Sequence, residues 1–438
     1  MKLLALITTL ILTTAACTTT AKLTRQAQYS LLKDTATANS SLGISIYDVA
    51  SNTYLYNLNA NKYFVPASNI KLFTCYAALK YLQDSLIGLQ YIRQGNQYEL
   101  FPTADPTLLH PKYSHQPVLS FLSSIGANYT FNFKAWQEQA QGTGWAWDDY
   151  TSDDATERSA LPLYANCVQV TRTATNFISY PSYFVSTQPK LVQAVISNAN
   201  GNMYSIERSL HSNQLIQVPS TNIFTTQRIP LLTSTGLSTA LLADTLQRLA
   251  HATPNLLLGT QGRLYSVYSQ PTDSVLKPMM HISDNFLAEQ CLLMVSHKVL
   301  GIMHNDSIIN YLKRNDFAGM PQQPRWVDGS GLSRYNMATP LSIVWLLRHM
   351  HNSFGMPRLQ CILATGGQGT LRNYYKQYAG NIYAKTGTLS NHVALSGYLV
   401  TRKQKLLIFS VLSSGHQGSA VPTRKAVQKL LAHYIEQY

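Results

Sequence analysis

Acidic residues are scarce in this chain. Only 12% of the 438 residues are charged, and 20 Asp and Glu stand against 34 Lys and Arg, which gives a formal net charge of +14 at pH 7. The positive excess therefore reflects missing acids and not long basic runs. No Lys/Arg-dense segment, aromatic-basic RNA motif or zinc-finger spacing is present, so the usual signatures of nucleic-acid binding are lacking. We expect anionic partners in general and no nucleic acid.

Cysteine is also rare, with five copies, and none lies in a CxxC pair that would indicate redox or zinc chemistry. No HExxH motif occurs, and His349 and His351 are two residues apart, which places them on different faces of a helix. No metal ion or cofactor is expected. An even number of cysteines follows Cys17, which allows two disulfides or, equally, buried free thiols: Cys75, Cys167, Cys291 and Cys361.

Long hydrophobic runs are missing as well. The apolar run from Leu3 to Ala16 is too short to span a bilayer comfortably and follows the basic Lys2, as in an export signal. Cys17 comes directly after two alanines, and this arrangement resembles a bacterial lipoprotein signal, in which that cysteine is acylated. Thr14 departs from the usual aliphatic residue, so cleavage without lipid stays an alternative. We predict a signal peptide over residues 1–17 and a periplasmic protein tethered to a membrane through lipidated Cys17.

The two ends of the remaining chain have α/β character. Ile44 and Ile46 alternate with polar residues before a turn at 50–52, which predicts a hairpin, and residues 68–82 have helical character. Three strands are expected near the other end, at 381–384, 393–400 and 406–412, followed by a closing amphipathic helix. We therefore predict one α/β domain assembled from residues 24–88 and 266–438.

Short strand-like runs separated by turns characterise the middle of the chain, residues 89–265. An example is the run 192–197, followed by Asn200-Gly201 and the run 203–206. No fixed-period repeat is present. These features predict one or two inserted β-rich domains.

The sharpest chemical signal is Ser68-Asn69-Ile70-Lys71, which opens an apolar helix. Residues at i and i+3 lie on one helical face, so the Lys71 amine can reach the Ser68 hydroxyl and take its proton. Taken alone, the pair equally fits a helix-capping serine followed by a solvated lysine.

Two further motifs strengthen the first one. Ser283-Asp284-Asn285 precedes a helical run, and Lys385-Thr386-Gly387-Thr388 ends a predicted strand. Each tripeptide alone is common, as a turn or a cap. The combination SxxK, SDN and KTG, in this order, is typical of β-lactamases and penicillin-binding proteins.

With these motifs the sequence resembles the low-molecular-mass penicillin-binding proteins of the D-Ala-D-Ala carboxypeptidase/endopeptidase family with a large insertion, peptidase family S13. Ser283 lies 215 positions after Ser68, which is much farther than in β-lactamases. Further matches cover nearly the whole mature chain: Trp147-Asp148-Asp149-Tyr150, Ser159-Ala160-Leu161, the stretch Asp328-Gly-Ser-Gly-Leu-Ser-Arg334 and Gly369-Thr370-Leu371-Arg372. The resemblance implies an antiparallel sheet sandwiched by helices, with small β-rich domains inserted after the nucleophile helix.

The resemblance also implies roles for the motif residues. Ser68 would attack the penultimate D-Ala carbonyl with Lys71 as base, Ser283 would relay the proton to the departing D-Ala, and Asn285 would orient Lys71. Lys385, Thr386 and Thr388 of the Lys385-Thr386-Gly387 strand would hold the terminal carboxylate, and backbone N–H groups of Ser68 and Thr388 would form the oxyanion hole.

Substrate recognition is the least specific part of the resemblance. Asp149 and Arg334 would hold the peptide stem, although a cap and a structural ion pair explain them equally well. The expected partners are peptidoglycan peptides ending in D-Ala-D-Ala or in D-Ala cross-links, with β-lactams as inhibitors.

Other functions fit less well. A class A β-lactamase needs a deacylating glutamate, yet no Glu occurs between Glu289 and Glu436. An unrelated esterase is disfavoured because no GxSxG motif is present. A catalytically silent wall-binding or β-lactam-sensing protein of the same fold stays an alternative.

Overall fold

The computed structural model describes residues 25–126, 128–172, 177–186, 204–219, 225–247 and 262–438. The predicted signal peptide with Cys17, the run 192–197 and Asn200-Gly201 lie outside these residues. Within the described part of the chain, no helix combines the length and the apolar character needed to cross a bilayer.

A six-stranded antiparallel sheet joins the two ends of the chain, in the order β12-β13-β14-β15-β1-β2. β1 pairs with β15 along its whole length, with Ser41 opposite Ser414. The predicted α/β fold with an antiparallel sheet is confirmed. The strands are β1 (Ser41–Asp48), β2 (Thr53–Leu58), β12 (Ala364–Thr365), β13 (Ile382–Leu389), β14 (His392–Val400) and β15 (Leu406–Ser414).

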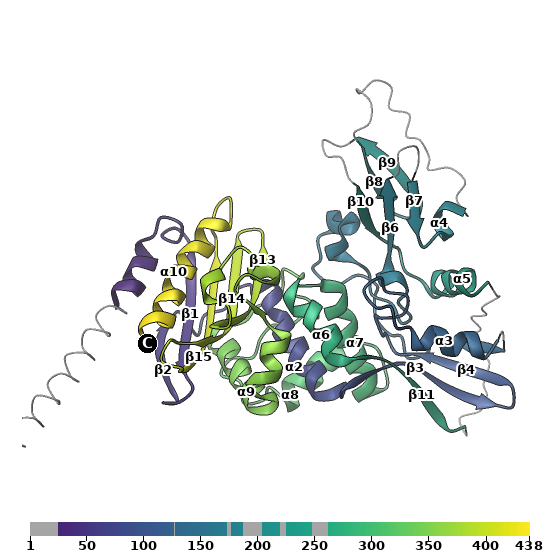
Figure 1. The fold of residues 1–438 in the computed structure, drawn as a ribbon, viewed down its shortest axis with the longest axis horizontal. Helices are drawn as coiled ribbons and strands as arrows, with labels where there is room; N and C mark the ends of the chain where they lie inside the picture. Colours follow the sequence, from purple (N-terminus) through teal and green to yellow (C-terminus); the bar gives the residue numbers. More distant parts are fainter. Residues whose placement is uncertain (1–24, 127, 173–176, 187–203, 220–224, 248–261) are drawn as a thin grey trace, which may run out of the picture.

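Both faces of this sheet are covered, because successive side chains of a strand point to opposite sides. In β15, Phe409 and Val411 pack in one core with residues of helix α10 (Val421–Gln437), whereas Ile408 and Leu412 belong to a second core. The near-continuous apolar run of β15 is thus explained by burial on both sides. In Figure 1, α10 lies along one side of the sheet.

The second core is built mainly from helices, and α2 lies at its centre. Nine consecutive residues of α2, from Lys71 to Leu79, are buried, which explains why its apolar residues are not confined to one face. The helical elements of this layer are η1 (Ala67–Ile70), α2 (Lys71–Tyr81), α6 (Thr272–His281), α7 (Asn285–Leu300), α8 (Asn305–Asn315) and α9 (Pro340–Ile362), and two short turns, η5 (Gly369–Leu371) and η6 (Lys376–Tyr378), lie before β13.

The middle of the chain forms separate small sheets with the orders β11-β3-β4-β5, β10-β6-β7 and β8-β9. In Figure 1 they extend away from the six-stranded sheet. Their strands are β3 (Ser85–Gln94), β4 (Gln97–Pro102), β5 (Tyr129–Phe131), β6 (Cys167–Arg172), β7 (Phe177–Tyr180), β8 (Tyr204–Arg208), β9 (Leu215–Pro219), β10 (Thr226–Pro230) and β11 (Leu264–Pro271). The helical segments are α3 (Pro117–Ser124), η2 (Trp147–Thr151), η3 (Asp153–Ala155), η4 (Tyr164–Asn166), α4 (Tyr183–Ser186) and α5 (Thr235–Leu246).

The entry and exit of this middle segment are two paired strands. β3 and β11 run antiparallel with Leu89 opposite Val267. The predicted boundaries at 88/89 and 265/266 fall inside these strands, so the connection between the two parts is a continuous ribbon. The exact domain limits stay predictions.

The four cysteines of the described residues are free thiols. Of the two alternatives drawn from the sequence, the free thiols are therefore confirmed. Cys75, Cys167 and Cys291 are buried as small hydrophobic groups, while Cys361 is exposed on α9 and not buried as expected.

Candidate active site

Ser68 lies in the short 3₁₀ turn η1, directly before helix α2. Its side chain is half-buried and lines a cleft, and the Lys71 Nζ lies 3.1 Å from its Oγ. The predicted i, i+3 pair is therefore in hydrogen-bonding distance. Asn69, fully buried between them in sequence, donates to the Lys385 carbonyl at 2.9 Å and so ties the nucleophile turn to strand β13.

Lys71 is fully buried, and its ammonium has three hydrogen-bond acceptors. Besides Ser68 Oγ, the Nζ donates to Asn285 Oδ1 at 2.5 Å and to the Ser330 carbonyl at 2.7 Å. Burial lowers the pKa of Lys71 to about 8, against the opposing effect of the Asp328 and Glu289 carboxylates. A neutral amine able to accept the Ser68 proton is thus accessible near physiological pH.

The second motif forms a turn and the start of helix α7. Asp284 caps this helix by accepting from the Leu287 N–H at 3.0 Å. Ser283 has φ +65°, a left-handed conformation that is uncommon for serine. Asn285 accepts from Lys71 and donates from its Nδ2 to the Asp154 carbonyl at 2.8 Å, so it links Lys71 to η3 of the middle segment.

Strand β13 brings the third motif to the cleft. The Lys385 side chain is fully buried, and its Nζ donates to Ser283 Oγ at 2.8 Å and to the Thr386 carbonyl at 2.7 Å. Burial, together with the nearby Lys71 charge, holds the pKa of Lys385 well below its usual range. A Cβ at Gly387 would lie 2.7 Å from the Pro66 carbonyl oxygen, so only glycine lets this strand pass so close to the nucleophile turn.

The loop that begins at Asp328 supports the lysine from behind. The Asp328 carboxylate is buried and accepts from the N–H groups of Gly331 at 2.8 Å and Ser333 at 2.6 Å. Glu289 accepts from the Ser330 N–H at 2.7 Å and so helps to fix the residue whose carbonyl accepts from Lys71. Gly331 has φ +83°, and a Cβ there would lie 2.0 Å from the Ala67 carbonyl oxygen.

The cleft brings together most of the predicted residues but not all of them. Ser68, Ser283, Asn285, Thr386, Gly387 and Thr388 line it, while Lys71 and Lys385 lie buried beneath their partners. Asp149 and Arg334 do not line this cleft. Asp149 is half-buried in η2, and the exposed Arg334 donates its backbone N–H to the Gly144 carbonyl at 3.3 Å.

Several cleft residues were missed from the sequence. Asp154 and Ser330 take part through backbone carbonyls, for which no side-chain pattern exists, and Arg372 and Arg424 line the cleft from segments with no motif chemistry of their own. Arg372 does belong to the Gly369-Thr370-Leu371-Arg372 match, which was the available signal. Burial raises the pKa of the Asp154 carboxyl, to which Asp153 also contributes.

Comparison with known proteins identifies the family. The family model described as the D-Ala-D-Ala carboxypeptidase 3 (S13) family matches residues 25–434. The chain belongs to this S13 family. The family and the enzyme class predicted from the sequence, a D-Ala-D-Ala carboxypeptidase, are both confirmed.

Relatives of this S13 protein span almost the whole chain. The D-alanyl-D-alanine carboxypeptidase of Actinomadura sp. (strain R39) is 24% identical over 93% of this chain and 84% of its own length. The crystal structure of penicillin-binding protein 4 (dacB) from Haemophilus influenzae matches with a TM-score of 0.72 at 17% identity, covering 93% of this chain and 98% of the other. A predatory peptidoglycan endopeptidase from Bdellovibrio bacteriovorus matches with a TM-score of 0.50 at 14% identity, covering 90% and 92%.

Proposed function

We propose that this S13 protein is a serine-type D-Ala-D-Ala carboxypeptidase and endopeptidase that cleaves peptidoglycan stem peptides through a Ser68 acyl-enzyme and is inhibited by β-lactams. The observation that carries the proposal is the buried Lys71 amine, held against Ser68 Oγ by Asn285 and Ser330 and able to lose its proton near pH 8. A structural lysine would not need this arrangement beside a half-buried serine in a cleft.

In the acylation step, neutral Lys71 takes the Ser68 proton while Oγ bonds to the carbonyl carbon of the penultimate D-Ala. The carbonyl oxygen becomes an oxyanion, which the backbone N–H groups of Ser68 and Thr388 are proposed to stabilise by hydrogen bonds. The C–N bond then breaks, and the departing D-Ala amine takes the proton of Lys71, relayed by the Ser283 hydroxyl, which leaves Lys71 neutral again. The 2.8 Å contact between Lys385 Nζ and Ser283 Oγ supports this role for Ser283.

In the deacylation step, neutral Lys71 takes a proton from water while the water oxygen bonds to the ester carbonyl carbon. The C–O bond to Ser68 then breaks, and Lys71 returns the proton to Ser68 Oγ. The shortened peptide is released with a new carboxylate. Before the D-Ala leaves in the acylation step, its carboxylate is proposed to accept hydrogen bonds from the Thr386 and Thr388 hydroxyls, which line the cleft on β13.

Recognition of the peptide stem and the location of the protein are part of the same proposal. Asp149 and Arg334 are proposed to bind the stem outside the cleft that Ser68 lines. The protein is proposed to work in the periplasm, anchored through lipidated Cys17. The excess of basic residues suits an anionic wall polymer.

The function is tested by incubating the purified mature protein with a peptide ending in D-Ala-D-Ala and, separately, with a fluorescent penicillin, followed by mass spectrometry. We expect released D-Ala from the first and a Ser68 adduct from the second. An adduct with no cleavage of this peptide or of a D-Ala cross-linked dimer would favour the β-lactam sensor. The absence of both products would refute the proposal.

The rate of acylation should depend on pH through Lys71. Only the neutral amine can accept the Ser68 proton, and with a pKa of about 8 the neutral fraction rises about tenfold per pH unit below neutrality. We therefore expect the second-order rate of penicillin acylation to rise from pH 6 and to level off near pH 9. Stopped-flow fluorescence measures this rate, and thermal melts at each pH control for unfolding. A flat profile over this range would contradict Lys71 as the base.

A further inference from the structure

Helix α10 places a cation at the edge of the cleft, far from all three motifs in sequence. The Arg424 Nη2 donates a hydrogen bond to Thr388 Oγ1, the last residue of the Lys385 motif, and Arg424 is one of the residues that line the cleft with Ser68. The helix that carries it is fixed, since Val427 and Leu431 of α10 are buried against the sheet. Arg424 is therefore presented from a rigid element.

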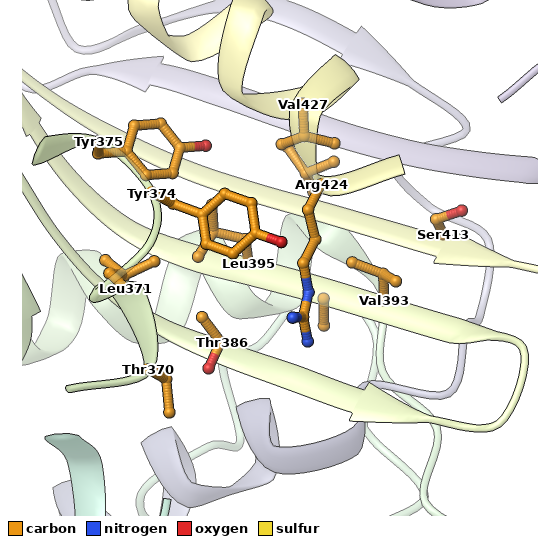
Figure 2. A pocket seen from close by; sticks show the side chains of 12 residues that line it. Thr370, Leu371, Tyr374, Tyr375, Thr386, Val393, Leu395, Ser413, Arg424 and Val427 are labelled. Carbon is orange, nitrogen blue, oxygen red and sulfur yellow. The ribbon is translucent and has the colours of Figure 1, made fainter. Parts of the chain in front are cut away.

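The stem of Arg424 crosses an apolar pocket between α10 and the sheet. Figure 2 shows the side chain extending from the helix between Tyr374 and Val393, with its guanidinium toward the strand that carries Thr386. The guanidinium carbon lies 5.8 Å from the centre of the Tyr374 ring, within the range of a cation–π contact. The apolar walls hold the methylenes, and the charged end is delivered to the cleft.

Among the residues that the structure describes, the Arg424 guanidinium has no acidic partner. Arg424 takes part in none of the ion pairs formed between the described residues. Its hydrogen bond to Thr388 uses only one of five N–H donors, so the planar fork retains the capacity to bind a carboxylate through two parallel bonds.

Lys385 is the other cation expected to act on the substrate carboxylate, but its ammonium already has hydrogen-bond acceptors within the protein. Lys385 is fully buried, and its Nζ is directed to Ser283 Oγ and to the Thr386 carbonyl. Its burial beside Lys71 also disfavours the charged form. The half-exposed Arg424 guanidinium supplies the positive charge that Lys385 supplies less well.

We propose that Arg424, together with Thr388, binds the carboxylate of the leaving D-amino acid and thereby makes the enzyme select peptides with a free carboxylate next to the cleaved bond. The assignment rests on the proposed function. It adds a specificity residue that comes from the C-terminal helix and not from any of the three motifs. A terminal D-Ala carries such a carboxylate beside the amide that is cleaved, and so does a cross-link formed through the D-centre of diaminopimelate.

The test compares two peptides that differ only at this group, one ending in D-Ala-D-Ala and one in D-Ala-D-alaninamide. Arg424→Met keeps an unbranched stem for the apolar pocket and removes the charge. We expect kcat/KM on the acid to fall by about 10- to 100-fold, the range for a charged hydrogen bond, and kcat/KM on the amide to stay unchanged. Arg424→Lys should retain part of the preference for the acid.

Lys425 provides the matched control, because it is the next residue on α10, carries the same charge and is exposed to solvent. Lys425→Met should leave both substrates unaffected. An equal loss on acid and amide in Arg424→Met would mean that Arg424 only supports the fold, and an unchanged value on both would mean that it does not touch the carboxylate; either result overturns the inference.

Failure of the proposed function would look different, because wild-type protein would then cleave neither peptide. In that case the same variants are compared in acylation by benzylpenicillin and by its methyl ester. A loss confined to the free acid supports the role of Arg424, and an equal response to both compounds, or no acylation at all, rejects it.

Discussion

Replacing Ser68 by alanine is expected to abolish covalent labelling by a fluorescent penicillin and the release of D-Ala. The substitution removes the only atom proposed to bond to the substrate and deletes one oxygen from a half-buried site. The fold should be retained, because three hydrogen bonds hold this turn in place without the Ser68 hydroxyl. Asn69 donates one of them and Lys71 donates the other two. Gel fluorescence after denaturation measures the adduct, and the thermal midpoint reports the fold.

Ser283 is the matched control, because it is the second serine hydroxyl of the same cleft. Ser283→Ala should still give a covalent adduct, formed about 10²- to 10⁴-fold more slowly, because this hydroxyl transfers a proton and forms no bond to the substrate. If Ser68→Ala were still labelled stoichiometrically, or if only Ser283→Ala lost all labelling, we would conclude that Ser283 and not Ser68 is the nucleophile.

The second large effect is expected for Lys71→Met. Methionine fits the length and the fully buried position of the lysine, but it leaves Asn285 Oδ1 and the Ser330 carbonyl without their shared donor. The acylation rate should fall by about 10²- to 10⁴-fold, and the rise of the rate with pH up to about 8 should disappear with the titrating amine. The loss of two buried hydrogen bonds should also lower the free energy of unfolding by about 1–3 kcal/mol.

Lys80 is the control that distinguishes an effect on catalysis from an effect on stability. It lies on the same helix α2 and forms an ion pair with the buried Asp316. Lys80→Met should therefore destabilise the protein while the acylation rate and its pH profile stay unchanged. If both variants lowered the acylation rate in proportion to their loss of stability, Lys71 would be a structural lysine.

Local sequence patterns were sufficient to predict the secondary structure of the two ends of the chain. The alternation around Ile44 and Ile46 corresponds to strands β1 and β2, and the apolar runs near the other end correspond to β13, β14 and β15. These patterns are reliable because burial on one or both faces of a sheet imposes them on neighbouring residues. The three motifs could also be identified from the sequence, because the residues of each motif lie within one turn or one strand.

The supporting contacts of the site could not be predicted in this way. The Ser330 carbonyl that receives Lys71 lies 259 residues from it, and the Asp154 carbonyl that receives Asn285 lies 131 residues away. A backbone carbonyl has the same chemistry in every residue, so nothing in its sequence position identifies it. Arg424 was not predicted as a cleft residue for a related reason. The hydrophobic period of α10 predicts the helix, but it does not indicate which of the polar residues of the helix reach the cleft.

The pairing of β1 with β15 has a consequence for the order in which the protein becomes active. Ser41 faces Ser414, so the first strand has no neighbour on that side until almost the entire chain has been made. The nucleophile turn likewise depends on β13, through Asn69 and Gly387, for its position. A chain that is still being synthesised therefore carries Ser68 and Lys71 without a formed cleft, and contacts of such long sequence separation form slowly. The proposed acylation of Ser68, by peptide or by penicillin, can therefore begin only when the C-terminal strands have paired.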